Sequence, residues 1–235
     1  MMKLVAVIAA LEEELLRIRG AMSSVTLTRL AGIDFHQGRI GDLPVVACKS
    51  GVGKVNASMC AQALIDRFAP NAIIFTGVAG ALDPTLDIGD AVISLDCQQH
   101  DIDVTSLGFP RGTLPEQETS VYPADSSLVT VARMACGDIL GREAFTGRIL
   151  SGDQFVANLE LAQNLHRDMG GACIEMEGAA VAQVCHANDT PFVVIRTISD
   201  RADGAAPHNF PAFLQEASDR SAQIVRSMLS LIASA

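Results

Sequence analysis

The sequence predicts an α/β fold, a single domain whose mixed, mostly parallel central sheet is flanked by helices. Short, uniformly apolar runs recur along the chain, as is typical of strands buried on both faces of a sheet. Segments with a helical spacing of apolar residues separate these runs, which favours parallel connections. No linker and no internal repeat interrupts residues 1–235, so we expect one domain.

Each expected element follows from its own stretch of sequence. Apolar or alternating runs predict strands at residues 3–10, 25–32, 34–40, 43–50, 71–80, 88–97, 145–153, 172–178 and 191–200. The second and third of these alternate polar and apolar residues, which indicates an antiparallel excursion. Helical spacing predicts helices at residues 54–68, 126–140, 158–169, 179–188 and 210–234. Residues 100–123 are rich in polar and turn residues and are expected to form a loop.

Composition and charge exclude several classes of protein. Apolar residues make up 49% of the chain and charged residues 19%, which is typical of a folded globular protein. No apolar run reaches the roughly 18–20 residues of a membrane helix. The apolar N-terminal run meets Glu12 to Glu14 rather than a cleavage site, so we expect no secretory signal. The net charge of −10 comes with no basic tract, which argues against nucleic-acid binding.

The cysteines and histidines predict no metal site. The six cysteines are scattered without a C-x-x-C pair: Cys48, Cys60, Cys97, Cys136, Cys173 and Cys185. Most have apolar neighbours, which fits free thiols in a reducing, cytoplasmic setting. His100, Asp101 and Asp103 resemble a metal cluster only weakly, since they fall in a predicted loop.

In mostly parallel sheets covered by helices, ligands bind beyond the carboxyl ends of the strands. The polar residues that follow the predicted strands are therefore the candidate site. They lie in residues 12–14, 50–54, 76–80, 151–155, 175–177 and 196–203.

The stretch KSGVGKVNAS (residues 49–58) superficially resembles a phosphate-binding loop. In the P-loop pattern, Cys48 takes the place of the first glycine and Val55 that of the magnesium-binding hydroxyl. A dinucleotide fingerprint also fails, because Asn56 stands where a third small residue belongs. Two interpretations stay open: a tight strand-to-helix turn, or a backbone that a sugar or base approaches closely.

Carboxylates dominate the candidate site. Glu177 and Asp200 follow strongly apolar strands, where a carboxylate is partly desolvated. Such groups suit a reaction that builds positive charge, for instance glycosidic cleavage with one carboxyl as the acid. For Glu12 to Glu14, a role as helix cap or dipole partner is an equally valid interpretation, and for Asp203 it is the favoured one.

Two further residues attract attention. Arg196 lies within a predicted buried strand, so it must pair with a structural carboxylate or anchor a substrate or water. In a strand that stays regular to its end, alternation places Arg196, Ile198 and Asp200 on one side and Thr197 and Ser199 on the other. Phe155 directly follows a strand end and is either a core residue or a stacking face for a planar base.

Seven stretches together resemble a known family. They are AALEEELL (9–16), KSGVGKVNA (49–57), TGVAGALDPTLDIGD (76–90), HDIDVTSLGF (100–109), SGDQF (151–155), IEMEGAAVAQVC (174–185) and VIRTISDRAD (194–203). In this order they resemble the 5′-methylthioadenosine/S-adenosylhomocysteine nucleosidases, which have the nucleoside phosphorylase fold. The resemblance implies hydrolysis of the bond between adenine and ribose, with no metal and no cofactor.

The resemblance also implies catalytic roles. Asp200 matches the acid that protonates adenine N7, and Ser199 matches a residue that orients it. Glu14 matches the residue that positions and activates the attacking water. Arg196 matches an arginine that organises this water and glutamate.

Substrate contacts are implied in the same way. Glu177 matches the carboxylate that grips the ribose hydroxyls, and Met176 an apolar contact beside the sugar. Phe155 matches the ring stacked on adenine, and Val156 a residue whose backbone reads the base edge. The remaining pocket residues are Val52, Val78 and Gly80, with Val104, Leu107, Phe109 and Pro115 in a loop lent by a neighbouring subunit. The resemblance thus implies a homodimer.

The sequence departs from the family pattern at three positions and leaves alternatives open. Val78 replaces a serine common near the sugar and water, Leu11 a methionine and Ala81 a glycine, which leaves the 5′ substituent undecided. A related adenosine derivative, such as 6-amino-6-deoxyfutalosine or 5′-deoxyadenosine, is an alternative substrate. A purine nucleoside phosphorylase would need cations where residues 12–14 are acidic. A non-catalytic nucleoside-binding protein would be expected to lack Asp200 or Glu14.

Overall fold

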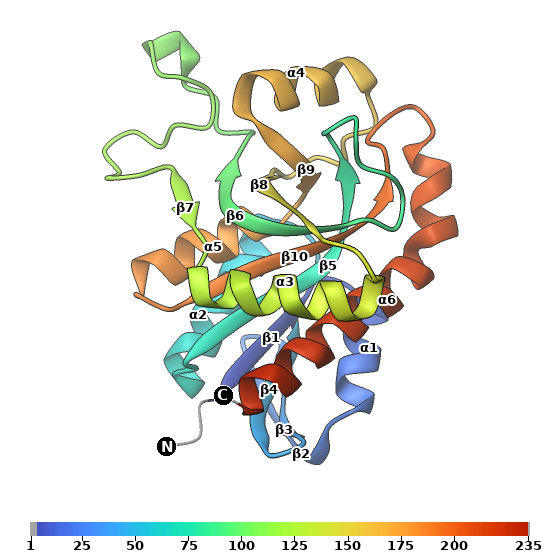
Figure 1. Cartoon of the computed structure of the whole chain (residues 1–235). Helices are drawn as coiled ribbons and strands as arrows, with labels where there is room; N and C mark the ends of the chain where they lie inside the picture. The colour runs from blue at the N-terminus through green and yellow to red at the C-terminus, as the bar shows by residue number, and fades with distance from the viewer. Residues whose placement is uncertain (1–3, 235) are drawn as a thin grey trace.

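The computed structural model of the chain describes residues 4–234 and contains one mixed sheet covered by helices (Figure 1). The strands are β1 (Val5–Ala9), β2 (Ser23–Leu30), β3 (Ile33–Ile40), β4 (Leu43–Lys49), β5 (Ala72–Ala81), β6 (Ala91–Gln99), β7 (Val121–Pro123), β8 (Phe145–Ser151), β9 (Gly171–Glu175) and β10 (Phe192–Asp200). The helices are α1 (Glu12–Gly20), α2 (Lys54–Phe68), a 3-10 turn η1 (Thr105–Leu107), α3 (Ser126–Leu140), α4 (Leu159–Met169), α5 (Gly178–Ala187) and α6 (Ala206–Ser234).

Parallel pairing brings the carboxyl ends of several strands to one edge. β1 pairs in parallel with β4 and β5, β5 with β10, and β8 with β6 and β9. β2 and β3 form the expected antiparallel excursion, and β3 also pairs antiparallel with β4. β10 pairs antiparallel with β6. Near its end β5 has two partners: Gly80 pairs with Ile174 of β9 and with Asp200 of β10. The ends of β5, β9 and β10 therefore meet at one place.

The apolar side chains of the strands pack into layers on both faces of the sheet. Along β1, Ala6 and Ile8 join the cluster that contains α2 and α5, whereas Val5 and Val7 join the cluster formed with α1, α3 and α6. Figure 1 shows α3 and α6 in front of the sheet and α2 and α5 behind it. This burial on both faces explains why the strands are uniformly apolar.

The predicted α/β fold is confirmed, with differences at particular elements. Helix α1 was not expected, because nine residues with only two buried apolar side chains give too short a period to recognise. β7 lies in the region predicted as a loop, and α6 begins at Ala206 rather than at residue 210. Of the strand expected at residues 3–10, Lys3 lies outside the described residues. Within residues 4–234, none of the helices combines the length and apolarity needed to cross a membrane.

The predicted alternation along β10 is wrong at the end of the strand. The pairing register with β5 shifts between Ile198 and Asp200. As a result Ser199 and Asp200 both line the same cavity, while Ile198 packs in the apolar core. A bulge of this kind re-aims a side chain next to a site.

Candidate active site

A cavity of about 400 Å³ lies where β1, β5, β9 and β10 end. It has the size and the largely apolar lining of a small-molecule site. Ten of the predicted site residues line it: Glu14, Val52, Val78, Gly80, Phe155, Val156, Met176, Glu177, Ser199 and Asp200. The fold therefore brings together residues from positions far apart in the sequence.

Asp200 lies buried at the end of β10, at the bulge described above. Its Oδ1 accepts a hydrogen bond from the Ala202 N–H (2.8 Å), and its Oδ2 accepts one from the Ser199 hydroxyl (2.9 Å). Gly80 provides the space, because a Cβ there would lie 2.8 Å from Asp200 Oδ1. Burial raises the pKa of Asp200 even though these two hydrogen bonds oppose the rise. Burial thus favours the protonated form of this carboxyl more than in an exposed aspartate.

Glu14 is held by backbone N–H groups at the start of α1. Its Oε2 accepts hydrogen bonds from Ala10 and Leu11 (2.8 Å each), and its Oε1 accepts one from Val78 (3.1 Å). Burial raises the pKa of Glu14, against the lowering effect of the charge of Arg196. Because Val78 contributes its backbone N–H, the loss of a side-chain hydroxyl at this position leaves this support of Glu14 in place.

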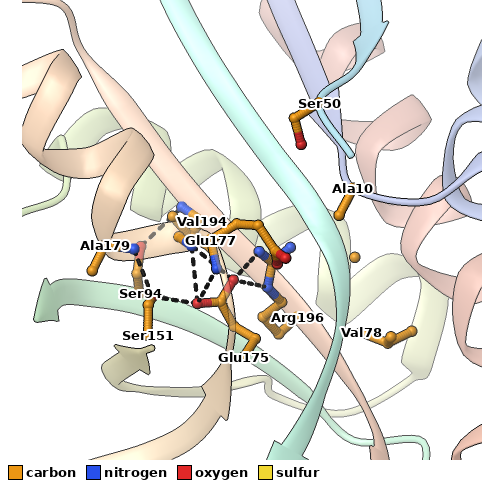
Figure 2. A network of polar contacts seen from close by, with 12 residues as sticks. Ala10, Ser50, Val78, Ser94, Ser151, Glu175, Glu177, Ala179, Val194 and Arg196 are labelled. Atoms are coloured by element: carbon orange, nitrogen blue, oxygen red, sulfur yellow. Dashed lines mark hydrogen bonds and ion pairs between the residues drawn. The ribbon is translucent and has the colours of Figure 1, made fainter. Parts of the chain in front are cut away.

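Arg196 pairs with Glu175, a residue that the sequence analysis placed at the strand end without a role. Figure 2 shows Glu175 between Ser151 and Arg196. Arg196 Nε donates to Glu175 Oε2 at 3.1 Å, and its guanidinium lies 4.1 Å from the centre of the Phe75 ring. Burial alone would lower the pKa of Arg196, but the charges of Glu175 and Glu14 raise it. Arg196 is thus a permanent cation paired with Glu175, which lines the cavity, although Arg196 itself does not.

Arg196 and Glu14 both approach β5 at Gly77, which has no side chain. A Cβ at this position would lie 2.6 Å from Glu14 Oε1 and 2.7 Å from Arg196 Nη1. Of the two alternatives for Arg196, the structure shows the first: it pairs with a structural carboxylate, Glu175. A role in anchoring a substrate or a water stays a prediction.

The glycine turn between β4 and α2 supports Glu177. The N–H of Gly53, a residue with φ of +95° that favours glycine, donates to Glu177 Oε1 at 2.8 Å. Burial and the neighbouring charge of Glu175 raise the pKa of Glu177 to about 7. Lys54 makes no phosphate cradle, because its Nζ donates to Asp101 Oδ1 at 2.6 Å. The turn is tight, and its backbone also approaches the cavity.

Aromatic and aliphatic side chains form the opposite wall. The Phe155 ring, half-exposed, meets Phe210 edge-on with 5.6 Å between ring centres. Phe210 and Leu214 line the cavity from α6, and neither was predicted to be a site residue. Ala10, Leu11 and Ile174 also line the cavity and lie outside the candidate ranges. Glu13, Ala79, Gln154 and Glu175 lie within those ranges, although no contact with a substrate was predicted for them. An apolar, half-open wall beside buried carboxyls suits a planar base.

The loop residues Val104, Leu107, Phe109 and Pro115 do not line this cavity of their own chain. Leu107 and Phe109 are exposed, on and beside η1. Asp103, one of the three residues that weakly resembled a metal cluster, forms an ion pair with Arg111. Among residues 4–234 there is no group of three or more His, Cys, Asp or Glu side chains suited to a metal ion.

Comparisons with known proteins show the family of the chain. Residues 4–230 match the model of the phosphorylase superfamily. A 5′-methylthioadenosine/S-adenosylhomocysteine nucleosidase from Geobacillus kaustophilus is 41% identical over 97% of each chain. The crystal structure of such a nucleosidase from Neisseria meningitidis, in complex with methylthio-immucillin-A, superimposes with a TM-score of 0.93. It is 35% identical, and the match covers 98% of this chain and 100% of that one.

A second activity also occurs among the similar structures. The native futalosine hydrolase of Helicobacter pylori superimposes with a TM-score of 0.92 at 31% identity, covering 98% of this chain and 99% of that one. The fold is therefore that of the nucleoside phosphorylases. Since both the family model and the relatives match over nearly the whole length, the chain belongs to the phosphorylase superfamily and, within it, to the 5′-methylthioadenosine/S-adenosylhomocysteine nucleosidases.

Proposed function

We propose that this protein hydrolyses the N-glycosidic bond of 5′-methylthioadenosine and S-adenosylhomocysteine, releasing adenine and the 5-thioribose product. The observation that carries the proposal is a buried Asp200 in the same cavity as Glu14 and Glu177. None of the described residues that line the cavity is a lysine or an arginine. Such a lining suits a positively charged, oxocarbenium-like transition state better than a phosphate nucleophile.

In the proposed reaction, the C1′–N9 bond breaks and its electron pair moves into adenine. Asp200 gives its proton to adenine N7, so the base leaves as a neutral molecule, and the Ser199 hydroxyl orients the carboxyl. General acid assistance of this kind is typically worth ~10²–10⁴-fold. The raised pKa of Asp200 supports this role, because the acid must be protonated when the base departs.

The water that attacks C1′ is assigned to Glu14. Its three backbone hydrogen bonds fix the carboxylate toward the cavity, and Arg196 beside it stabilises the ionised form that accepts the proton of the water. Glu177 grips the ribose hydroxyls, with Met176 and Val52 beside the sugar. Phe155 stacks on adenine, while the Val156 backbone reads the edge of the base.

We further propose that the protein forms a homodimer and that it is located in the cytoplasm. The exposure of Leu107 and Phe109 supports a loop, residues 104–115, that completes the 5′-alkylthio pocket of a neighbouring subunit. Six free, buried cysteines support a cytoplasmic, reducing location. We propose that the chain, residues 1–235, forms one domain.

The rival substrate is a futalosine-type adenosine derivative, because futalosine hydrolase has the same fold. The test is kcat/KM for adenine release from methylthioadenosine, adenosylhomocysteine, 5′-deoxyadenosine and 6-amino-6-deoxyfutalosine. We expect the two thioethers to give the highest values, since the cavity wall is largely apolar. A value for aminodeoxyfutalosine more than tenfold above both thioethers would reassign the substrate without changing the reaction.

A further inference from the structure

Lys54 follows the glycine turn directly, yet its side chain does not line the cavity. It is only 15% exposed, and its partner Asp101 is 17% exposed. Lys54 Nζ donates to Asp101 Oδ1 at 2.6 Å and to Gln99 Oε1 at 2.9 Å. A partly buried ion pair with a second hydrogen bond is held far more firmly than a surface pair.

The contact continues into a closed ring. The Asp153 N–H donates to Asp101 Oδ2 at 2.9 Å, and Asp153 Oδ1 accepts from the Lys54 N–H at 2.8 Å. We call these three residues the Lys54–Asp101–Asp153 ring. Burial alone would raise the pKa of Asp101, but the hydrogen bonds from Lys54 and from the Asp153 N–H lower it. Asp101 therefore stays ionised and serves as the centre of the ring.

The ring joins two segments that line the cavity, those of Val52 and Phe155, to a third segment that carries Asp101. Lys54 is bonded to Gly53, whose N–H holds Glu177. Asp153 lies two residues before Phe155, and a Cβ at Gly53 would lie 3.1 Å from Asp153 Oδ1. The ring thus links the turn that supports Glu177 to the segment that carries Phe155.

We propose that Lys54 is a positioning residue for the reaction: through Asp101 and Asp153 it holds the Gly53 N–H against Glu177 and keeps the Phe155 segment beside the cavity. The inference rests on the proposed function, in which Glu177 grips the ribose and Phe155 stacks on adenine. Lys54 itself touches no substrate. Its effect should appear in nucleoside binding, because both contacts exist before the bond breaks.

The test is to measure kcat and KM for methylthioadenosine, together with Tm, in Lys54→Met, Asp101→Asn and the double variant. Each single substitution is expected to lower kcat/KM by about 10–100-fold, mostly through a higher KM. The kcat/KM of the double variant should be no lower than that of the more impaired single variant, since either change already opens the ring. Lys54→Arg, which keeps the charge, should recover most of the loss.

Arg29→Met is the matched control, since it removes a cation from the exposed Arg29–Asp34 pair on β2 and β3 and should leave KM unchanged. If Lys54→Met does not fold, the isosteric Asp101→Asn provides the same reading. Folded single variants with a wild-type KM, or losses that multiply in the double variant, would overturn the inference. A wild-type protein that releases no adenine would instead overturn the proposed function.

Discussion

Replacing Asp200 with asparagine is expected to lower kcat by about 10²–10⁴-fold, the usual contribution of a general acid. The asparagine can keep both hydrogen bonds of Asp200: its oxygen accepts from the Ala202 N–H, and its amide donates to the Ser199 hydroxyl. The fold and the nucleoside site should therefore persist while the proton for N7 is lost. The measurement is kcat for adenine release beside a calorimetric Kd for methylthioadenosine.

Asp203→Asn is the matched control for this change. Asp203 caps the turn before α6, where its Oδ1 accepts from the Ala205 N–H, and it does not line the cavity. We expect its kcat to stay within about threefold of the wild type, a change of under 1 kcal/mol. Near-normal turnover by Asp200→Asn would reject Asp200 as the acid.

Replacing Glu177 with glutamine is expected to lower kcat/KM by about 10²-fold while making the ligand-free protein more stable at pH 8. Charge-assisted hydrogen bonds to the ribose hydroxyls are lost, and each is worth roughly 1.5–3 kcal/mol. The glutamine oxygen can still accept from the Gly53 N–H, so the turn should keep its place. Kinetics and chemical denaturation of the same sample report both effects.

The stability gain depends on pH, because burial and Glu175 raise the pKa of Glu177 to about 7 in the folded state. Below about pH 4 this carboxyl is protonated in both the folded and the unfolded chain, so it contributes no pH dependence. As the pH rises toward 7 the unfolded chain releases the proton first, and folding loses free energy. Above pH 7 the loss is complete, and we expect the glutamine variant to regain about 1–3 kcal/mol.

Glu160→Gln, an exposed change in the first turn of α4, serves as the control and should alter neither activity nor the pH dependence of unfolding. A stability difference for Glu177→Gln that is the same at pH 5 and pH 8 would show that Glu177 is not forced to ionise in a desolvated site. Loss of expression alone, with wild-type kcat/KM, would make its role structural.

The polar residues that follow apolar strands could be placed from the sequence, because parallel strands end at the same edge of a sheet. That rule predicts that Glu177 and Asp200 lie close together. The cost of burying a charge in an apolar strand separately predicts that Arg196 has a partner. It could not tell which of Glu175 and Glu177 pairs with Arg196. The two carboxylates are only two residues apart, and the sequence does not show that β9 ends at Glu175 while Glu177 directly precedes α5.

Long-range and irregular features could not be predicted. Phe210 lines the cavity from α6, and the apolar pattern of that helix does not show which other segments its first turns pack beside. The bulge at the end of β10 is a local shift in pairing that no periodicity encodes. The partner of Lys54 is 47 residues away in the chain. The contribution of residues 104–115 to a second subunit stays a prediction, since it depends on a surface that one chain does not contain.

The central claim is that water, not phosphate, attacks the sugar in this cavity. The most direct measurement is the rate of adenine release from methylthioadenosine in phosphate-free buffer, with and without added inorganic phosphate. We predict the same rate in both buffers and a free 5-thioribose as the second product. Strict dependence on phosphate, with a sugar 1-phosphate as product, would contradict the account.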